Sequence, residues 1–350
     1  MNPQQPTSPF QVNGIEQREV SMASNYSSTK PTRSLRTKAR YSHLYKLMRD
    51  QFMRESGRYD LTAEEVVAIA IQKKHESCMS SWRSTKAVLM FALETKFPQF
   101  TAALEALEAE SSAGLEKFSS KTSGQKKKFV PAAQWAALQS TLRQRISREH
   151  KHAQGLLYVL TATLLTGLRP NEWCHSHRSI HAATGRPVLR VRNSKVSNGR
   201  ANGDFREMFI DGLDAVELEA VDGALAYCSC DNDDDAQRIE TAMKNELENA
   251  RDRTLSNRQQ TQSSITLYSF RHQFVANAKQ TFQKPELIAA LAGHSSTKTA
   301  FEHYGKRRNG TGVVKVVPTP ESLEAVLKVT LEIYKDFVLS RSRTSTFRPS

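Results

Sequence analysis

Two arginines, a histidine and a tyrosine in the second half of the chain have the side-chain types needed to transfer a phosphodiester. They are Arg169, Arg271, His294 and Tyr304. An arginine presents a rigid, permanently charged fork that suits bidentate capture of a phosphate. A phenol can attack phosphorus and keep the broken bond as a covalent ester, which makes the exchange reversible. The set therefore predicts phosphodiester cleavage that needs no metal ion, ATP or other cofactor.

Residues that end and begin helices place Arg169 in a short connection. Gly167 is expected to end a helix over residues 155–165, and Pro170 suits the first turn of the next helix. An arginine held between two such helices has little conformational freedom left to lose when it binds a phosphate. Glu172, three residues further on, is expected to orient Arg169 through a hydrogen bond.

A second glycine has the same position relative to His294. Gly293 ends a helix that begins at Pro285, so His294 is expected directly at the helix end. There it can bond a phosphate or hold the nucleophile, and the alternative is that it only caps the helix. Residues 295–297 then begin another short helix that presents Tyr304.

The motifs around these residues resemble those of the tyrosine recombinases, the phage-integrase family. The matching segments are Thr166-Gly167-Leu168-Arg169, Arg271-His272, Leu291-Ala292-Gly293-His294 and His303-Tyr304-Gly305. The resemblance covers residues 35–340. It implies a mainly α fold with a small β-hairpin or sheet (α+β), made of an N-terminal helical core-binding (SAM-like) domain and a tyrosine-recombinase catalytic domain. It also implies that Tyr304 is the nucleophile.

The chain departs from the family pattern at one catalytic position. Tyr268 stands where the signature His-x-x-Arg-His box, here at Arg271-His272, has its first histidine. A tyrosine still donates a hydrogen bond to a phosphate oxygen, but its unperturbed pKa of about 10 makes it a poorer proton shuttle at neutral pH. His272 is expected to pack inward. His303 stands nine positions after His294, where many relatives have the tyrosine, but only the phenol of Tyr304 suits a reversible exchange.

A hairpin between the two arginines carries a candidate acid. Residues 187–192 alternate as a strand, residues 205–210 return, and Lys195 lies in the turn between them. The resemblance implies that Lys195 protonates the departing 5′ oxygen, a poor leaving group without a proton. The alternative is a basic hairpin that only contacts phosphate, together with Arg200.

The overall charge predicts a polyanionic partner. The 350 residues carry a formal net charge of +14, which suits double-stranded DNA. No apolar run is long enough to span a bilayer, so an intracellular, cytoplasmic protein associated with DNA is expected. Four irregularly spaced cysteines indicate reduced thiols. Cys228 and Cys230, with Cys174, do not have the spacing of a known zinc finger, so no metal site is expected.

The pattern along the chain predicts six parts. They are a disordered tail (1–33), a helical domain (34–118), a basic linker (119–128), a second domain (129–318), a C-terminal helix (319–340) and a second tail (341–350). The resemblance implies that residues 34–118 are the core-binding DNA clamp and residues 129–318 the catalytic domain. In the clamp domain, one helix has an apolar face formed by Tyr41, Leu44, Tyr45, Leu47 and Met48. A capping box over residues 62–65 begins the next helix, and residues 81–90 and 100–115 complete the four.

Basic side chains in several parts are candidates for contact with DNA. They are Arg83, Lys86, Lys126, Lys127, Lys128, Arg192 and Arg200. An ordinary solvated face and a flexible hinge are the alternatives for the clamp and the linker. The resemblance suggests that the C-terminal helix docks on a neighbouring protomer, with packing on its own domain as the alternative.

These observations predict a site-specific recombinase that cuts and rejoins DNA through a 3′-phosphotyrosyl intermediate. The resemblance implies a homo-tetramer on two DNA duplexes with accessory DNA-binding proteins, acting as an integrase or excisionase of a mobile element or as a resolvase. Two alternatives remain open. One is a relaxing enzyme of the type IB topoisomerase kind, and the other is a DNA-binding protein without activity, in which Tyr268 marks the loss of catalysis.

Overall fold

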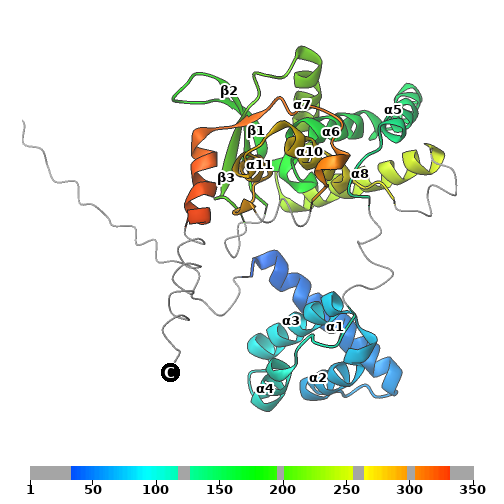
Figure 1. Cartoon of the computed structure of the whole chain (residues 1–350). Coiled ribbons are helices and arrows are strands. Elements are labelled where there is room, and N and C mark those ends of the chain that lie inside the picture. Colours follow the sequence, from blue (N-terminus) through cyan, green and yellow to red (C-terminus); the bar gives the residue numbers. More distant parts are fainter. Residues whose placement is uncertain (1–32, 117–126, 195–200, 255–263, 298–303, 332–350) are drawn as a thin grey trace, which may run out of the picture.

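Two separate hydrophobic cores divide the chain. The computed structural model describes residues 33–116, 127–194, 201–254, 264–297 and 304–331. One core lies within residues 45–107 and the other within residues 130–316. We call the described residues 33–116 the N-terminal unit, blue to cyan in Figure 1, and the described residues 127–331 the C-terminal unit.

The N-terminal unit consists of four α-helices and a short 3-10 helix. They are α1 (Leu35–Ser56), α2 (Ala63–Gln72), η1 (Lys73–Glu76), α3 (Met79–Lys96) and α4 (Thr101–Ala109). The capping box predicted at Thr62 and Glu65 is present, with each side chain accepting a hydrogen bond from the other residue's backbone N–H. Trp82 of α3 is fully buried in the core of this unit.

Two expectations for the N-terminal unit were wrong in detail. The helix expected over residues 100–115 ends at Ala109, because Ser111, Ser112 and Gly114 favour turns over helix. Leu47 does not contribute to the apolar face of α1, since its side chain is 49% exposed. The other four predicted residues, Tyr41, Leu44, Tyr45 and Met48, do pack on this core, and Phe52 and Met53 of α1 add to it.

The C-terminal unit is mainly helical, and its helices come from distant parts of the chain. Its α-helices are α5 (Ala132–Ser147), α6 (Ala153–Thr166), α7 (Ala215–Cys228), α8 (Asp233–Thr254), α10 (Leu267–Thr281) and α11 (Pro285–Ala292). The core helix α6 packs against α5, α7 and α10. Asn232 caps α8, since its side-chain oxygen accepts hydrogen bonds from the backbone N–H groups of Asp234 and Asp235.

A four-stranded antiparallel sheet flanks these helices. The strands are β1 (Ser176–Ile180), β2 (Pro187–Arg192), β3 (Phe205–Phe209) and β4 (Val317–Pro318), in that order across the sheet (Figure 1). The predicted hairpin is the β2–β3 pair, with Arg190 opposite Glu207. The α+β class predicted from the sequence is confirmed. The sequence analysis missed β1, whose residues are mostly polar, and β4, which has two residues.

The last described segment is a helix over residues 320–331. Its Leu323 and Val326 side chains pack on Ala289 and Ala290 of α11 in the same chain. Leu331 is 58% exposed, and the predicted helix beyond residue 331 lies outside the described residues. The first turns therefore dock in cis, and docking of the remainder on a neighbour stays a prediction. Among the described residues, no helix has both the length and the apolar composition that crossing a membrane requires.

Candidate active site

Arg169 lies in the connection that the sequence predicted, and its side chain is buried. Gly167 ends α6 with φ of 70°, and a Cβ there would lie 2.1 Å from the Phe274 ring. The short 3-10 helix η3 (Pro170–His175) begins directly after Arg169. The Arg169 backbone N–H donates to Glu172 Oε2 at 2.8 Å, and its guanidinium donates to Glu172 Oε1. Glu172 thus holds both the backbone and the side chain of Arg169.

Arg271 is fully buried in α10, and the carbonyl ends of two other helices hold it. Its guanidinium donates to the carbonyl of Gly167 after α6 and, at 2.5 Å, to that of Ala292 at the end of α11. Helix C-termini favour a cation, so both helices stabilise the charge at this point. The orientation leaves Arg271 Nε directed at Tyr304, with the donor 3.3 Å from the phenolic oxygen.

His294 follows α11 as predicted and is 1% exposed. Gly293 makes the turn with φ of 61°, and His294 Nε2 lies 3.3 Å from an Arg271 guanidinium nitrogen. Burial, with added repulsion from Arg271 and Arg169, lowers the pKa of His294 well below its ordinary value. The ring is therefore neutral near pH 7, so one of its nitrogens can donate a hydrogen bond and the other can accept one. Its Nδ1 is buried without a hydrogen-bond partner among the described residues.

Tyr304 lies between two imidazole rings. The ring centroid of His272 is 4.8 Å from that of Tyr304, and the centroid of His294 is 4.9 Å away. The Arg271 guanidinium carbon is 5.2 Å from the same ring. His272 packs inward, as expected, and burial lowers its pKa to about 4. Residues separated by more than 130 positions, from Arg169 to Tyr304, thus meet at one place.

Tyr268 lies at the edge of this cluster. It precedes Arg271 by one turn of α10, and its side chain is 39% exposed. Burial raises its pKa, and the nearby charges of Arg169 and Arg271 oppose that change. No hydrogen bond joins its hydroxyl to another described residue, so the phenol is available to an incoming group.

The charges of the cluster do not cancel. The Glu172 carboxylate lies within ion-pair distance of three guanidinium groups, those of Arg169, Arg206 and Arg271. Burial alone would raise the pKa of Glu172, but the three arginines outweigh it and hold the pKa well below its usual range. Burial and Arg169 lower the pKa of Arg271 to about 10, which leaves it protonated at neutral pH. Three cations and one anion leave two positive charges, an arrangement suited to bind a phosphate.

The other predicted residues are dispersed. Lys126, Lys195 and Arg200 lie outside the described residues. Arg192 is exposed at the end of β2, and Lys128 is exposed close enough to His272 to lower its pKa. Lys127 donates to the Gln134 side chain at 2.8 Å. Arg83 donates to the Ser112 hydroxyl, and the Lys86 ammonium donates to the carbonyls of Glu108 and Glu110 at the end of α4.

The sequence analysis missed a basic stretch on α1. Lys38, Arg40 and Lys46 are exposed, and no acidic residue occurs between positions 33 and 49. The side chains of these three residues have no hydrogen bond or ion pair to any residue that the structure describes. The available signal was the recurrence of basic residues over positions 33–49 without an acidic residue among them. Arg206, discussed below, was also missed.

Two of the four cysteines lie in the core of the C-terminal unit. Cys174 and Cys228 pack in the same hydrophobic core, and burial raises the pKa of the Cys174 thiol to about 12. Within the described ranges, no three His, Cys, Asp or Glu side chains are grouped to hold a metal ion.

Comparison with known proteins identifies similar folds among solved structures. No family model and no curated protein sequence matches the chain. The structure of the Tn1549 transposon integrase in complex with circular intermediate DNA is 14% identical, with a TM-score of 0.42 over 81% of this chain and 93% of that one. A variant of that integrase, with another circular intermediate DNA, is 13% identical, with a TM-score of 0.40 over 82% and 93% of the two chains.

Proposed function

We propose that this protein is a site-specific DNA recombinase of the tyrosine recombinase family, acting as an integrase or excisionase of a mobile element or as a resolvase. The observation that carries the proposal is the meeting of Arg169, Arg271, His294 and the Tyr304 hydroxyl at one site with excess positive charge. A surface tyrosine without a reaction to perform has no need of buried cations around its hydroxyl.

We assign the roles from the resemblance and from the positions of the described residues, and the role of Lys195 rests on the resemblance alone. Arg169 and Arg271 bind the non-bridging oxygens of one phosphate, and the charge that develops on them during attack meets donors that are already oriented. His294 and Tyr268 add donors. The Tyr304 oxygen attacks phosphorus, the bond to the 5′ oxygen breaks, and a 3′-phosphotyrosyl ester forms. Lys195 supplies the proton for the 5′ oxygen. A 5′ hydroxyl from a partner duplex then reverses the step.

The assembly belongs to the same proposal. Strand exchange between two sites requires four active sites, so we infer a homo-tetramer on two DNA duplexes, with accessory DNA-binding proteins setting direction. The N-terminal unit acts as a clamp on the duplex opposite the catalytic unit. Basic residues at the linker, including Lys127 and Lys128, then lie along the phosphates.

The test begins with a binding site. The Tyr304→Phe protein, which cannot form the ester, is used to enrich bound sequences from a pool of random duplexes. An enriched sequence is then rebuilt as a suicide duplex with a nick close to the cleaved phosphate, so that the cut strand diffuses away. Wild-type protein is expected to form a covalent protein–DNA adduct on a denaturing gel.

Tyr304→Phe is expected to reduce the adduct to background without loss of DNA binding. Tyr158→Phe is the matched control, because the Tyr158 hydroxyl donates to the Glu219 side chain at 3.2 Å, away from the cluster. Binding by wild type without any adduct would support a DNA-binding protein without activity. An adduct accompanied by plasmid relaxation, with no exchange between two sites, would support a topoisomerase-like enzyme.

A further inference from the structure

Arg206 is a fully buried arginine that no sequence motif identified. It lies on β3 and is 1% exposed. Its guanidinium donates to three acceptors: Glu172 Oε2 at 2.8 Å, the Leu291 carbonyl at 2.9 Å, and the Asn193 side-chain oxygen. These acceptors belong to η3, to α11 and to the segment after β2. One side chain therefore joins three elements around the candidate active site.

Neutralisation of Glu172 does not explain this arginine. The Glu172 carboxylate is already paired with Arg169, and Arg271 lies 3.8 Å away. Arg206 adds a further cation to a buried cluster that already has more positive than negative charge. Burial of a charge costs several kcal/mol, and an apolar residue of similar volume generally packs at lower cost. The cost of burying the Arg206 charge is best explained if this side chain fixes the positions of the groups to which it is hydrogen-bonded.

The geometry reaches Arg169 by way of Glu172. Glu172 Oε2 accepts from both the Arg169 backbone N–H and Arg206 Nη2, each at 2.8 Å. The other carboxylate oxygen accepts from the Arg169 guanidinium. Arg206 thus fixes the side chain that orients Arg169.

The same guanidinium holds the turn before His294. A Cβ added at Gly293 would lie 2.5 Å from Asn193 Oδ1 and 2.7 Å from Arg206 Nη1. The Gly293 backbone therefore packs directly against the Arg206–Asn193 hydrogen bond. Because Arg206 also binds the carbonyl of Leu291, it sets the position of the turn that delivers His294.

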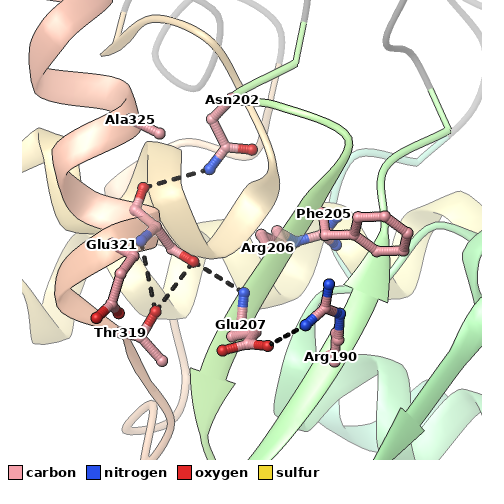
Figure 2. Close-up of a pocket in the computed structure, with 9 residues that line it drawn as sticks. Arg190, Asn202, Phe205, Arg206, Glu207, Thr319, Glu321 and Ala325 are labelled. Atoms are coloured by element: carbon pink, nitrogen blue, oxygen red, sulfur yellow. Dashed lines mark hydrogen bonds and ion pairs between the residues drawn. The ribbon is translucent and has the colours of Figure 1, made fainter. Parts of the chain in front are cut away.

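Asn193 and Asn202 extend this network to the base of the hairpin. The Asn193 amide donates to the Asn202 side-chain oxygen at 3.0 Å and to the Gly203 carbonyl at 2.8 Å. Asn202 in turn reaches the Ser322 carbonyl at 3.4 Å, in the helix over residues 320–331 (Figure 2). Hydrogen bonds thus hold the chain both after β2, at Asn193, and before β3, at Asn202.

We infer that Arg206 is a positioning residue for the phosphate-binding set, acting by way of Glu172 on Arg169 and by way of Leu291 and Asn193 on the turn before His294. The inference rests on the proposed function. Misplacement of a phosphate-binding group by about 1 Å reduces an enzyme's rate on the order of 10²-fold. The effect of losing Arg206 should therefore appear in the bond-breaking step and not in DNA affinity.

The experiment compares two suicide duplexes that differ only at the scissile phosphate. One duplex has an ordinary phosphate at the cleaved position, and the other has a methylphosphonate, in which a methyl group replaces one charged non-bridging oxygen. A neutral centre depends less on correctly placed guanidinium groups. Arg206→Met and Arg206→Lys are expected to lower single-turnover cleavage of the phosphate about 10²-fold and of the methylphosphonate less than about 10-fold. The DNA dissociation constant is expected to stay within about twofold of wild type.

Two further variants keep the result interpretable. Arg186→Gln removes an exposed arginine beside the same sheet, paired with Asp211 at 2.7 Å, and should leave both rates unchanged. Asn193→Ala removes one acceptor of Arg206 and leaves the Arg206–Glu172 pair in place. It should show a smaller loss, with the same preference for methylphosphonate. It replaces the Arg206 variants if their unfolding midpoints show that they do not fold.

The outcomes separate the two proposals. Equal losses on both duplexes, or wild-type cleavage of the phosphate by folded Arg206 variants or by Asn193→Ala, would overturn the role of Arg206. Absence of an adduct from the wild-type protein on both duplexes would instead overturn the proposed function.

Discussion

The two units of this protein handle charge in opposite ways. Among the described residues of the N-terminal unit, no Arg, Lys, Asp or Glu side chain is buried, and its core is entirely apolar. The C-terminal unit buries seven such residues: Arg145, Arg169, Glu172, Arg206, Glu246, Arg271 and Lys279. Because removal of a charge from water is costly, charges stay at the surface unless a fixed structure rewards their burial. The described residues of the N-terminal unit contain no buried group of charged side chains that would offset this cost.

A second contrast lies within the C-terminal unit itself. Arg145 and Glu246 form a closed pair with two hydrogen bonds of 2.6 and 2.8 Å, so their charges cancel. The cluster around Glu172 has three arginines for one carboxylate. A balanced pair stabilises the fold, whereas an unbalanced one retains affinity for an anion. This difference separates the candidate active site from an ordinary buried ion pair.

The largest effect is expected when a glutamate is replaced by glutamine in each of the two units. Glu172→Gln leaves three buried guanidinium groups without a counter-charge and is expected to lower the free energy of unfolding by about 3–5 kcal/mol. Glu65→Gln removes a carboxylate that also accepts from a cap and an arginine, but at the exposed surface of α2. Its effect should be much smaller. Urea unfolding of both proteins at pH 7 measures the difference, and equal losses would contradict it.

The second test uses pH. Burial holds the pKa of folded His272 at about 4, against an ordinary value of 6.5, so the unfolded chain takes up the proton first as the pH falls. The stability that His272 contributes is complete above pH 6.5 and is lost as the pH falls from 6.5 towards 4. His294, whose pKa burial also lowers, adds to the loss in the same direction.

His272→Gln is therefore expected to flatten the dependence of stability on pH between pH 4.5 and 6.5, by about 1.4 kcal/mol per pH unit. His43→Gln, at an exposed position of α1 in the N-terminal unit, is the control. It should leave the slope as in wild type. An unchanged slope in His272→Gln would show that the buried imidazole does not carry the effect.

The smallest effect concerns DNA binding by the N-terminal unit. The Arg40 and Lys46 side chains on α1 have no hydrogen bond or ion pair to another described residue. The Lys86 ammonium, in contrast, donates to the carbonyls of Glu108 and Glu110 at 2.9 and 2.6 Å. Each contact with a phosphate contributes roughly 0.9 to the slope of log affinity against log salt. Replacement of both Arg40 and Lys46 by Gln is expected to reduce that slope by about 1.8.

Lys86→Gln is the matched variant in this experiment. It should leave the salt slope unchanged and lower the thermal stability of the N-terminal unit, because α4 loses a donor at its C-terminus. The reverse result, a reduced slope with Lys86→Gln and none with the α1 pair, would favour the sequence-based choice of Arg83 and Lys86 on α3. Filter binding at several salt concentrations distinguishes the two.

Local signals in the sequence predicted the parts of the site that depend on local structure. Gly167 and Pro170 bracket Arg169 within four positions, and Gly293 precedes His294 directly, so helix ends alone place both side chains. The capping box at Thr62 and the hairpin of β2 and β3 followed from spacings of a few residues. The roles assigned to these residues, and the boundaries of the domains, stay predictions.

Other features depend on residues far apart in the chain and left no local pattern. The hydrogen-bond partners of Arg206 stand 13, 34 and 85 positions away, so nothing beside it in the sequence marks it as buried. The residue types next to it on β3 do not distinguish a buried arginine from one on the solvated face of a strand. Strand β1 was missed for a similar reason, since its polar residues pair by backbone hydrogen bonds that do not depend on side-chain type.

The sequence by itself determined which side chains are available for chemistry and which of them stand at helix ends, because caps and breakers act over a few residues. Only the tertiary structure decided that Arg169, Arg271, His294 and Tyr304 meet, that one carboxylate serves three arginines, and that Lys86 is held by two carbonyls while the Arg40 and Lys46 side chains have no partner among the described residues. Burial and charge balance are sums over every group that packs nearby, and most of those groups come from distant parts of the chain.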